Sequence, residues 1–142
     1  MDYNVLIADN LAPVAAGVLA DAGINVKTRH GLNEDQLVEA IKGFHGILVR
    51  SAVKVTSRVI QAGADLKVIG RAGIGVDNID VRAANDRGVL VFNVPGGNSI
   101  TAAEHTLGLM FCLARNIPAA AASMKAGRWD RKRFSGRELT GL

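Results

Sequence analysis

Lys67-Val68-Ile69-Gly70-Arg71-Ala72-Gly73-Ile74-Gly75 is the stretch that decides the fold, because a short apolar run passes directly into a glycine-rich turn. Four further runs of Val, Ile and Leu alternate with helical stretches, at residues 5–8, 24–27, 46–49 and 89–92. Strands that alternate with helices indicate a parallel sheet. Runs that are apolar throughout are typical of a sheet with helices on both faces. The sequence therefore predicts a doubly wound, parallel, five-stranded α/β domain of the flavodoxin-like kind.

Helix-capping residues lie between these runs. Pro13 suits the first turn of a helix that Gly23 would end, because proline is tolerated there and glycine accepts the left-handed turn that follows. Short polar side chains that can accept a hydrogen bond from a helix amide precede the other helical stretches. The predicted N-caps are Asn33 (with Gln36 as its capping-box partner), Thr56 and Asp80, and Gly88 is expected to follow the last of these helices.

The pattern changes after Gly97. Thr101 and Glu104 have the spacing of a capping box, and the helix that they would open, residues 101–115, carries apolar side chains around most of its circumference. A helix that is apolar all round is expected to be buried, so we predict that it packs in a second domain or against another subunit. A second, alanine-rich helix is expected from about Pro118 to near Gly127.

Charge is concentrated near the C-terminal end. From residue 125 onward there are six basic and two acidic side chains, which accounts for the whole net charge of +4. We expect residues 128–142 to form an extended basic arm. No secretion signal and no apolar run of membrane-spanning length is visible, and the lone Cys112 is typical of a reduced buried thiol. The expectation is a cytoplasmic protein without a membrane partner.

Basic side chains follow two neighbouring strands of the predicted sheet. Arg50, Ser51 and Lys54 come directly after the strand at 46–49, and Arg71 follows the strand at 67–69 inside the glycine-rich turn. Ligands of parallel α/β sheets bind beyond the carboxyl ends of the strands, and glycine-rich turns can direct amide groups at an anion. We therefore predict an anion site at this edge. The alternative is that each arginine merely pairs with a nearby aspartate.

Two other kinds of site are not indicated. Gly73-x-Gly75 begins like a dinucleotide-binding fingerprint, but Asn78 stands where the third glycine belongs. His30, His45 and His105 have no spacing that suggests a metal site. The sequence thus predicts neither a complete dinucleotide site nor a metal site within these residues.

Longer motifs carry a resemblance to a known family. The runs 49–56, 67–78, 92–95 and 98–104 are similar to the D-isomer-specific 2-hydroxyacid dehydrogenases, and most of all to their phosphoglycerate-oxidising members. The likeness covers essentially the whole chain. It implies a homodimeric or tetrameric NAD-dependent oxidoreductase of serine biosynthesis that converts D-3-phosphoglycerate to 3-phosphohydroxypyruvate.

The resemblance also implies roles for parts of this chain. Residues 1–97 would be the N-terminal part of the substrate domain, and residues 98–142 the first helices and basic arm of the NAD-binding domain. The helix 101–115 would form the core of a dimer, and the arm would offer Arg131 or Arg133 to the partner. Ile74 would meet the cofactor only weakly, since some relatives have a threonine hydroxyl there. The implied substrate-binding residues are Arg50, Ser51, Lys54, Arg71 and Asn98, together with the amides of Ala72 and Gly73.

The resemblance places the glycine fingerprint and the catalytic arginine, glutamate and histidine beyond Leu142, so the chain alone is expected to be inactive. Three alternatives remain open: a non-catalytic anion-binding or dimerisation module, another D-2-hydroxyacid dehydrogenase, and a nucleic-acid-binding protein. The last is disfavoured because only Trp129 and Phe134 interleave with the basic arm. A signalling receiver domain is disfavoured because Arg50 stands where it would need an aspartate.

Overall fold

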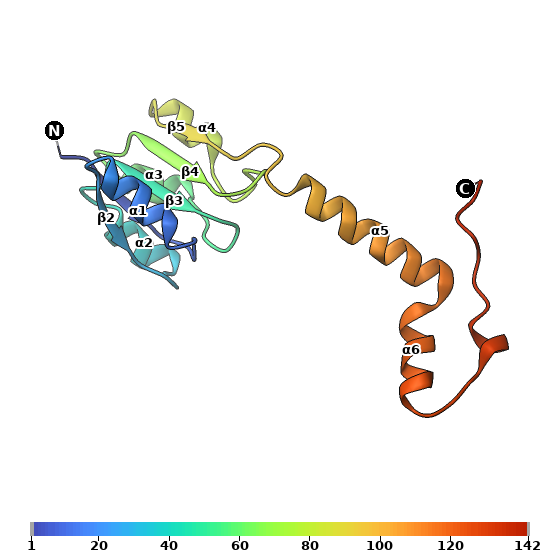
Figure 1. The fold of residues 1–142 in the computed structure, drawn as a ribbon. Helices are drawn as coiled ribbons and strands as arrows, with labels where there is room; N and C mark the ends of the chain where they lie inside the picture. The colour runs from blue at the N-terminus through green and yellow to red at the C-terminus, as the bar shows by residue number, and fades with distance from the viewer. Residues whose placement is uncertain (1, 142) are drawn as a thin grey trace. The chain divides into compact units, whose positions relative to one another are not determined.

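The computed structural model describes residues 2–141 and contains one parallel sheet of five strands (Figure 1). The strand order is β2-β1-β3-β4-β5, with every neighbouring pair parallel. This is the predicted flavodoxin-like order, and each strand lies within two residues of its predicted position. The strands are β1 (Asn4–Ile7), β2 (Asn25–Thr28), β3 (Gly46–Val49), β4 (Val68–Arg71) and β5 (Leu90–Phe92).

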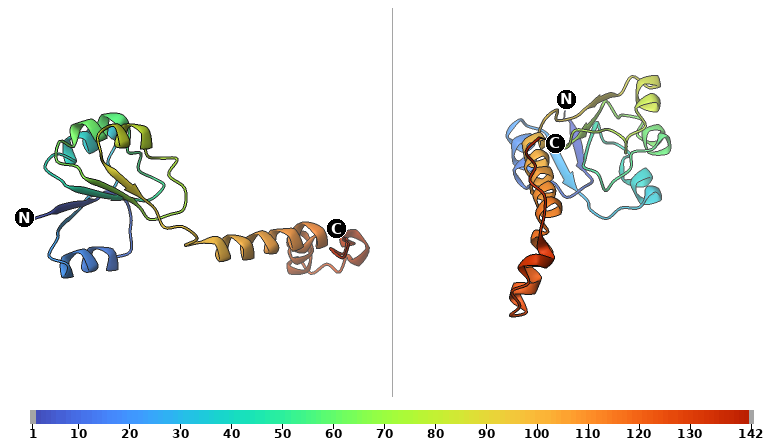
Figure 2. Two further views of the ribbon diagram at one scale, coloured as in Figure 1. Left: turned by 90° about the horizontal axis from the view of Figure 1, so that it is seen from above. Right: turned by 90° about the vertical axis from the view of Figure 1, so that its right-hand side faces the viewer.

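Helices cover both faces of the sheet, but unequally. Figure 2 shows α1 alone on one face and α2, α3 and α4 together on the other. The predicted caps at Asn33, Thr56 and Asp80 are confirmed, since each side chain accepts from the amide three residues later. Asn33 and Gln36 also form both bonds of the capping box. The helices are α1 (Val14–Asp21), α2 (Glu34–Ala40), α3 (Ser57–Ala62) and α4 (Val81–Asp86).

The core lies between the sheet and the three helices α2 to α4. Leu6, Ile47 and Ile69 stand beside one another on three adjacent strands and are fully buried. Helix side chains such as Ile41 and Ile60 complete the same cluster. By contrast, α1 has no buried residue. The three-helix face therefore supplies most of the apolar burial that stabilises the sheet. This packing holds the ends of the strands in fixed positions relative to one another.

The chain divides into two compact units between Gly97 and Asn98. The second unit begins with α5 (Ser99–Arg115), which starts two residues before the predicted Thr101. The predicted capping box is wrong, because Thr101 is already inside the helix and Asn98, the residue at the N-cap, makes no side-chain cap bond. The helix α6 (Ile117–Lys125) follows, and a short 3-10 helix, η1 (Arg131–Phe134), interrupts the arm that was expected to be irregular.

Asn116 joins α5 to α6 in a left-handed conformation, with φ of 54°. Its side chain donates to the carbonyl of Ser135 over 3.1 Å, and the Arg137 amide donates to the carbonyl of Ala114 over 2.8 Å. The arm is thus held along the end of α5. Among the described residues no single helix is long and apolar enough to cross a membrane; α5 and α6 pass such a test only as a pair, and they are bent by 67°.

The apolar surface of α5 is exposed within the described chain, so its packing against a second domain or another subunit stays a prediction. His105, on the same helix, is exposed too. The physical reason is that, inside its own unit, α5 has only α6 and the arm as neighbours. Five large apolar side chains of the helix are between 45% and 81% exposed: Leu107, Leu109, Met110, Phe111 and Leu113.

Candidate anion site at the carboxyl edge of the sheet

Two arginines come from neighbouring strand ends, as predicted. Arg71 is the last residue of β4 and stands beside Val49, the last residue of β3, so that Arg50 follows immediately. The Ala72 amide donates to the Val49 carbonyl over 2.9 Å and continues this pairing. The fold therefore brings both residues to one edge of the sheet.

The Arg71 side chain lies inside the glycine-rich turn. One terminal nitrogen, Nη1, donates to the carbonyl of Gly75, and Nη2 lies 3.7 Å from a carboxylate oxygen of Asp77. The Arg71 side chain is only 11% exposed, whereas that of Asp77 is 83% exposed. The Nε atom of Arg71 is buried and has no partner among the described residues. The ion pair that was the alternative interpretation of this arginine is thus present, and Nε stays without a partner among the described residues.

Glycine in this turn leaves room for the ends of two neighbouring side chains and is not there for backbone conformation. A Cβ atom at Gly75 would stand 2.8 Å from an Asp77 oxygen and 3.2 Å from Arg71 Nη1, and one at Gly73 would stand 3.3 Å from the same nitrogen. Neither glycine has a positive φ. The turn therefore wraps closely around the guanidinium because it has no side chains at these two positions.

The two amides that were predicted to bind a carboxylate already have acceptors within the protein. The Ala72 amide donates to Val49 in the strand ladder, and the Gly73 amide donates over 2.9 Å to the carbonyl two residues earlier. Both donors are therefore occupied by the protein. The next two amides of the turn, those of Ile74 and Gly75, have no backbone acceptor among the described residues.

The other predicted residues are less closely joined. Arg50 Nη1 lies 3.4 Å from the carbonyl of Asn10, and the side chains of Ser51 and Lys54 are exposed. Lys54 lines two small cavities of about 250 and 300 Å³. No described contact brings Lys54 to either arginine. Asn98 belongs to the second unit, where it is the N-cap residue of α5.

Ile74 was predicted to be a weak cofactor contact, and its side chain is 41% exposed. Its carbonyl accepts a hydrogen bond of 2.5 Å from the side chain of Asn93, which follows β5. The Val94 amide also donates to the Gly73 carbonyl over 2.9 Å. The segment after β5 thus supports the outer side of the glycine-rich turn.

Asp9 is the functional candidate that the sequence reasoning missed. It follows β1, is 8% exposed, and accepts hydrogen bonds at Oδ2 from the amides of Arg50, Ala52 and Val53 over 3.0, 3.2 and 3.3 Å. Its Oδ1 accepts from the Asn10 amide over 2.7 Å. The Asp9 side chain therefore binds the main chain of the loop that carries Arg50.

Asn78 holds the same loop from another segment. Its Nδ2 donates to the carbonyls of Arg50 and Val53, over 2.6 Å in both cases. The main chain of Asn78 accepts a further bond from the Val55 amide over 2.8 Å. Asn78 is buried, and its Oδ1 has no partner among the described residues. From the sequence, Asn78 was noted only because it stands where a dinucleotide fingerprint would have its third glycine.

The surroundings of Asp9 lower the pKa of its carboxyl group. Burial by itself raises the pKa, but the four backbone amides that bind the charged carboxylate outweigh it, so the net direction is below the ordinary 3.8. A folded pKa below the unfolded value means that the unfolded chain takes up the proton more readily. The stabilisation is thus complete above the unfolded value and is lost as pH falls through the folded value.

Asp9→Asn should reveal this dependence in thermal unfolding. At pH 7 the variant is expected to be less stable by about 1–3 kcal/mol, because amides buried with the loop lose a charged acceptor. Between pH 7 and pH 3 the unchanged chain should lose more stability than the variant, which has no titrating group at this position. Equal acid sensitivity of both proteins would contradict the role of Asp9.

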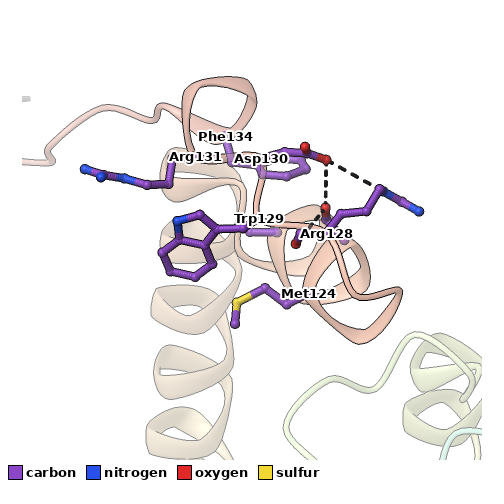
Figure 3. Close-up of a pocket in the computed structure, with 8 residues that line it drawn as sticks. Met124, Arg128, Trp129, Asp130, Arg131 and Phe134 are labelled. Carbon is purple, nitrogen blue, oxygen red and sulfur yellow. Dashed lines mark hydrogen bonds and ion pairs between the residues drawn. The ribbon is translucent and has the colours of Figure 1, made fainter.

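Another cavity, of about 210 Å³, lies in the second unit between α6 and η1 (Figure 3). Ala120, Met124, Trp129 and Phe134 give it an apolar lining. Asp130 points away from the Trp129 ring and accepts from the buried Ser123 hydroxyl over 3.0 Å. The apolar lining of this cavity does not suit an anion. No group of three or more metal-ligating side chains occurs among residues 2–141.

A family model described as the catalytic domain of D-isomer specific 2-hydroxyacid dehydrogenases matches residues 5–138. The chain belongs to this family. It is 51% identical over 97% of its length to D-3-phosphoglycerate dehydrogenase of Rattus norvegicus and equally to that of Methanocaldococcus jannaschii. In both comparisons it covers 26% of the relative. The chain therefore spans about a quarter of the length of these dehydrogenases.

Solved structures agree with the family assignment. The TT0316 protein of Thermus thermophilus superposes with a TM-score of 0.87 at 29% identity, over 98% of this chain and 46% of that one. An NAD⁺-bound 3-phosphoglycerate dehydrogenase of Entamoeba histolytica superposes with a TM-score of 0.76 at 29% identity, over 98% and 44%. The chain therefore shares its fold with a solved 3-phosphoglycerate dehydrogenase.

Proposed function

We propose that this chain forms the substrate-anion site of an NAD-dependent D-3-phosphoglycerate dehydrogenase, which produces 3-phosphohydroxypyruvate for serine biosynthesis. The observation that carries the proposal is the pair Arg50 and Arg71 on neighbouring strand ends, in a chain about half identical to such dehydrogenases. A substrate with a carboxylate and a phosphate needs several separate donors, and arginine has a planar fork that suits both groups.

Each proposed residue has a different part in this site. The guanidinium groups of Arg50 and Arg71 attract the substrate's negative charges, and Ser51 and Lys54 add a hydroxyl donor and a mobile ammonium on the same loop. The amides of Ile74 and Gly75 replace those of Ala72 and Gly73 as the proposed main-chain donors, since only the former pair has no backbone acceptor among the described residues. For Asn98, a substrate-binding role stays a prediction from the resemblance.

The dinucleotide is proposed to bind outside these residues. Asn78 occupies the position of the third fingerprint glycine, and its buried side chain is bonded to the Arg50 loop. The glycine-rich turn also does not open a helix, because α4 begins only at Val81. The residues present therefore do not fit a dinucleotide phosphate site. NAD supplies the hydride acceptor in the complete enzyme, and this chain supplies substrate recognition but no catalytic residue.

The partner proposed for α5 is a second copy of the chain, in a homodimer or tetramer. The five apolar side chains exposed along this helix form a surface that a monomer would leave in water. The arm, held against the end of α5, would present Arg131 or Arg133 to the substrate of the partner. The oligomeric part of this proposal is tested separately from substrate binding.

Titration of the isotope-labelled 142-residue chain with D-3-phosphoglycerate tests the substrate proposal. The amide signals of Arg50, Ser51, Ile74 and Gly75 are expected to shift saturably in nuclear magnetic resonance spectra. Arg71→Ala should weaken binding by roughly 10- to 100-fold, because a hydrogen bond to a charged group contributes about 1.5–3 kcal/mol. Arg71→Lys should also weaken binding, since it keeps the charge but loses the fork.

Arg58→Ala is the matched control, because Arg58 is an exposed arginine on α3 that pairs with Glu34 and Asp35 away from the site. It should leave the affinity unchanged. D-Glycerate and inorganic phosphate, each with one of the two anionic groups, should bind more weakly than D-3-phosphoglycerate. Equal affinity for phosphate would instead favour a general anion-binding module. Mixing the chain with NAD and D-3-phosphoglycerate should produce no NADH. Measurable NADH would overturn the proposal that this chain binds the substrate but supplies no catalytic residue.

A further inference from the structure

The loop from Arg50 to Val53 is bound on one side through its amides. Three of its four amide groups, those of Arg50, Ala52 and Val53, point at a single oxygen of Asp9. Asp9 is 41 to 44 residues away in sequence and follows β1, the strand beside β3. Among the described residues, no basic side chain lies within ion-pair distance of the Asp9 carboxylate. Its negative charge is therefore stabilised by these three amides and by the amide of Asn10.

The same loop is bound on another side through its carbonyls. The carboxamide of Asn78 uses both of its N–H groups, one for the Arg50 carbonyl and one for the Val53 carbonyl. A rotated carboxamide would set its oxygen against two carbonyl oxygens, so the observed orientation is the one the loop requires. The cost is a buried Oδ1 without a partner among the described residues. Such a cost in a buried group indicates that the two donated bonds are important.

Asp9 and Asn78 together hold the loop by main-chain atoms at both of its ends. Val53 is buried, which anchors one end further, while Arg50 and Ser51 are exposed at the edge of the sheet. The loop has no regular secondary structure of its own. Without the two side chains, binding of an anion would have to order the loop and would lose affinity to that entropy.

We propose that Asp9 and Asn78 are positioning residues for the substrate anion: they fix the main chain of residues 50–53 so that the Arg50 and Ser51 side chains meet the ligand without reordering. This inference rests on the proposed function, and it assigns a role to two residues that do not touch the substrate. A negative charge at Asp9 by itself repels an anion nearby. Removing this charge should therefore tighten substrate binding if Asp9 acts only through its charge, and should weaken binding if Asp9 positions the loop.

The experiment is a titration of Asp9→Asn and Asn78→Ala chains with D-3-phosphoglycerate, beside amide hydrogen exchange of the free proteins. Positioning predicts weaker binding by at least about tenfold for each variant, since ordering even one backbone residue on binding corresponds to roughly that factor. Electrostatics alone predicts tighter binding by Asp9→Asn and no change for Asn78→Ala. Faster exchange of the Ala52 and Val53 amides should accompany the loss in Asp9→Asn.

Ile60→Val, a substitution in the fully buried core, is the control for general destabilisation. It should lower stability without changing affinity or exchange in the loop. Unchanged or tighter binding by Asp9→Asn, together with an unaltered loop, overturns the inference. If the unchanged chain does not bind D-3-phosphoglycerate, the proposed function fails; the exchange rates then still decide whether the two side chains order the loop.

Discussion

A chain carrying Leu113→Glu is expected to sediment as a monomer at concentrations at which the unchanged chain is a dimer. Leu113 is 81% exposed on α5. Burying such a side chain stabilises an interface by roughly 1.5–3 kcal/mol, and a two-fold symmetric interface contains it twice. The expected loss is therefore about 3–6 kcal/mol, which corresponds to a factor above about 100 in the dissociation constant.

Val18→Glu supplies the comparison, because Val18 is a similarly exposed helix residue, at 62%, on α1 of the first unit. This variant should retain the association of the unchanged chain. Sedimentation velocity over a concentration series gives both constants. The proposal for α5 is wrong if the unchanged chain remains monomeric at the highest concentration or if both variants behave alike.

Gly136→Ala should release the arm from the end of α5. A Cβ atom at Gly136 would lie 2.2 Å from the carbonyl oxygen of Ala114 and 2.7 Å from the Cα of Arg115. Both are main-chain atoms that cannot move aside as a flexible side chain could. Forcing extra volume into such a contact costs about 1–3 kcal/mol, and the bond from the Arg137 amide to Ala114 should break. Hydrogen exchange of the Arg137 amide and proteolysis within the arm measure the release.

Gly108→Ala is also a glycine-to-alanine substitution, but it is expected to raise stability where Gly136→Ala lowers it. Gly108 lies inside α5, and a Cβ atom there would meet nothing within 4 Å. Alanine should therefore stabilise the helix by about 0.4–1 kcal/mol, because it lowers the entropy of the unfolded chain. If both glycine variants released the arm equally, the close contact at Gly136 would not be the cause.

Local patterns predicted the first unit well because its strands and caps are set by nearby residues. The apolar runs located the strands, and Asn33 and Asp80 marked helix starts with side chains that bond only three residues ahead. The same logic failed at Thr101. Its spacing with Glu104 satisfied a local rule, but the helix had already begun at Ser99. Spacing alone did not determine which turn of an uninterrupted helix comes first.

The site was predictable only in part. The rule that ligands bind at the carboxyl ends of parallel strands led to Arg50 and Arg71, whose places follow from strand order. Asp9 and Asn78 were missed because their bonds to the loop join residues 25 to 44 positions apart. The available signal was a polar residue directly after an apolar strand, which is how Asp9 stands in the sequence. The occupied amides of Ala72 and Gly73 could not be inferred from residue types at all.

The support of the Arg50 loop by its own amides and carbonyls has an evolutionary consequence. Asp9 and Asn78 bind no side chain of residues 50–53. Mutations that exchange the side chains at positions 50, 51 and 52 should therefore leave the path of the backbone intact. A lineage that carries this loop could change which acid it recognises by single substitutions, without first having to rebuild the scaffold that presents them.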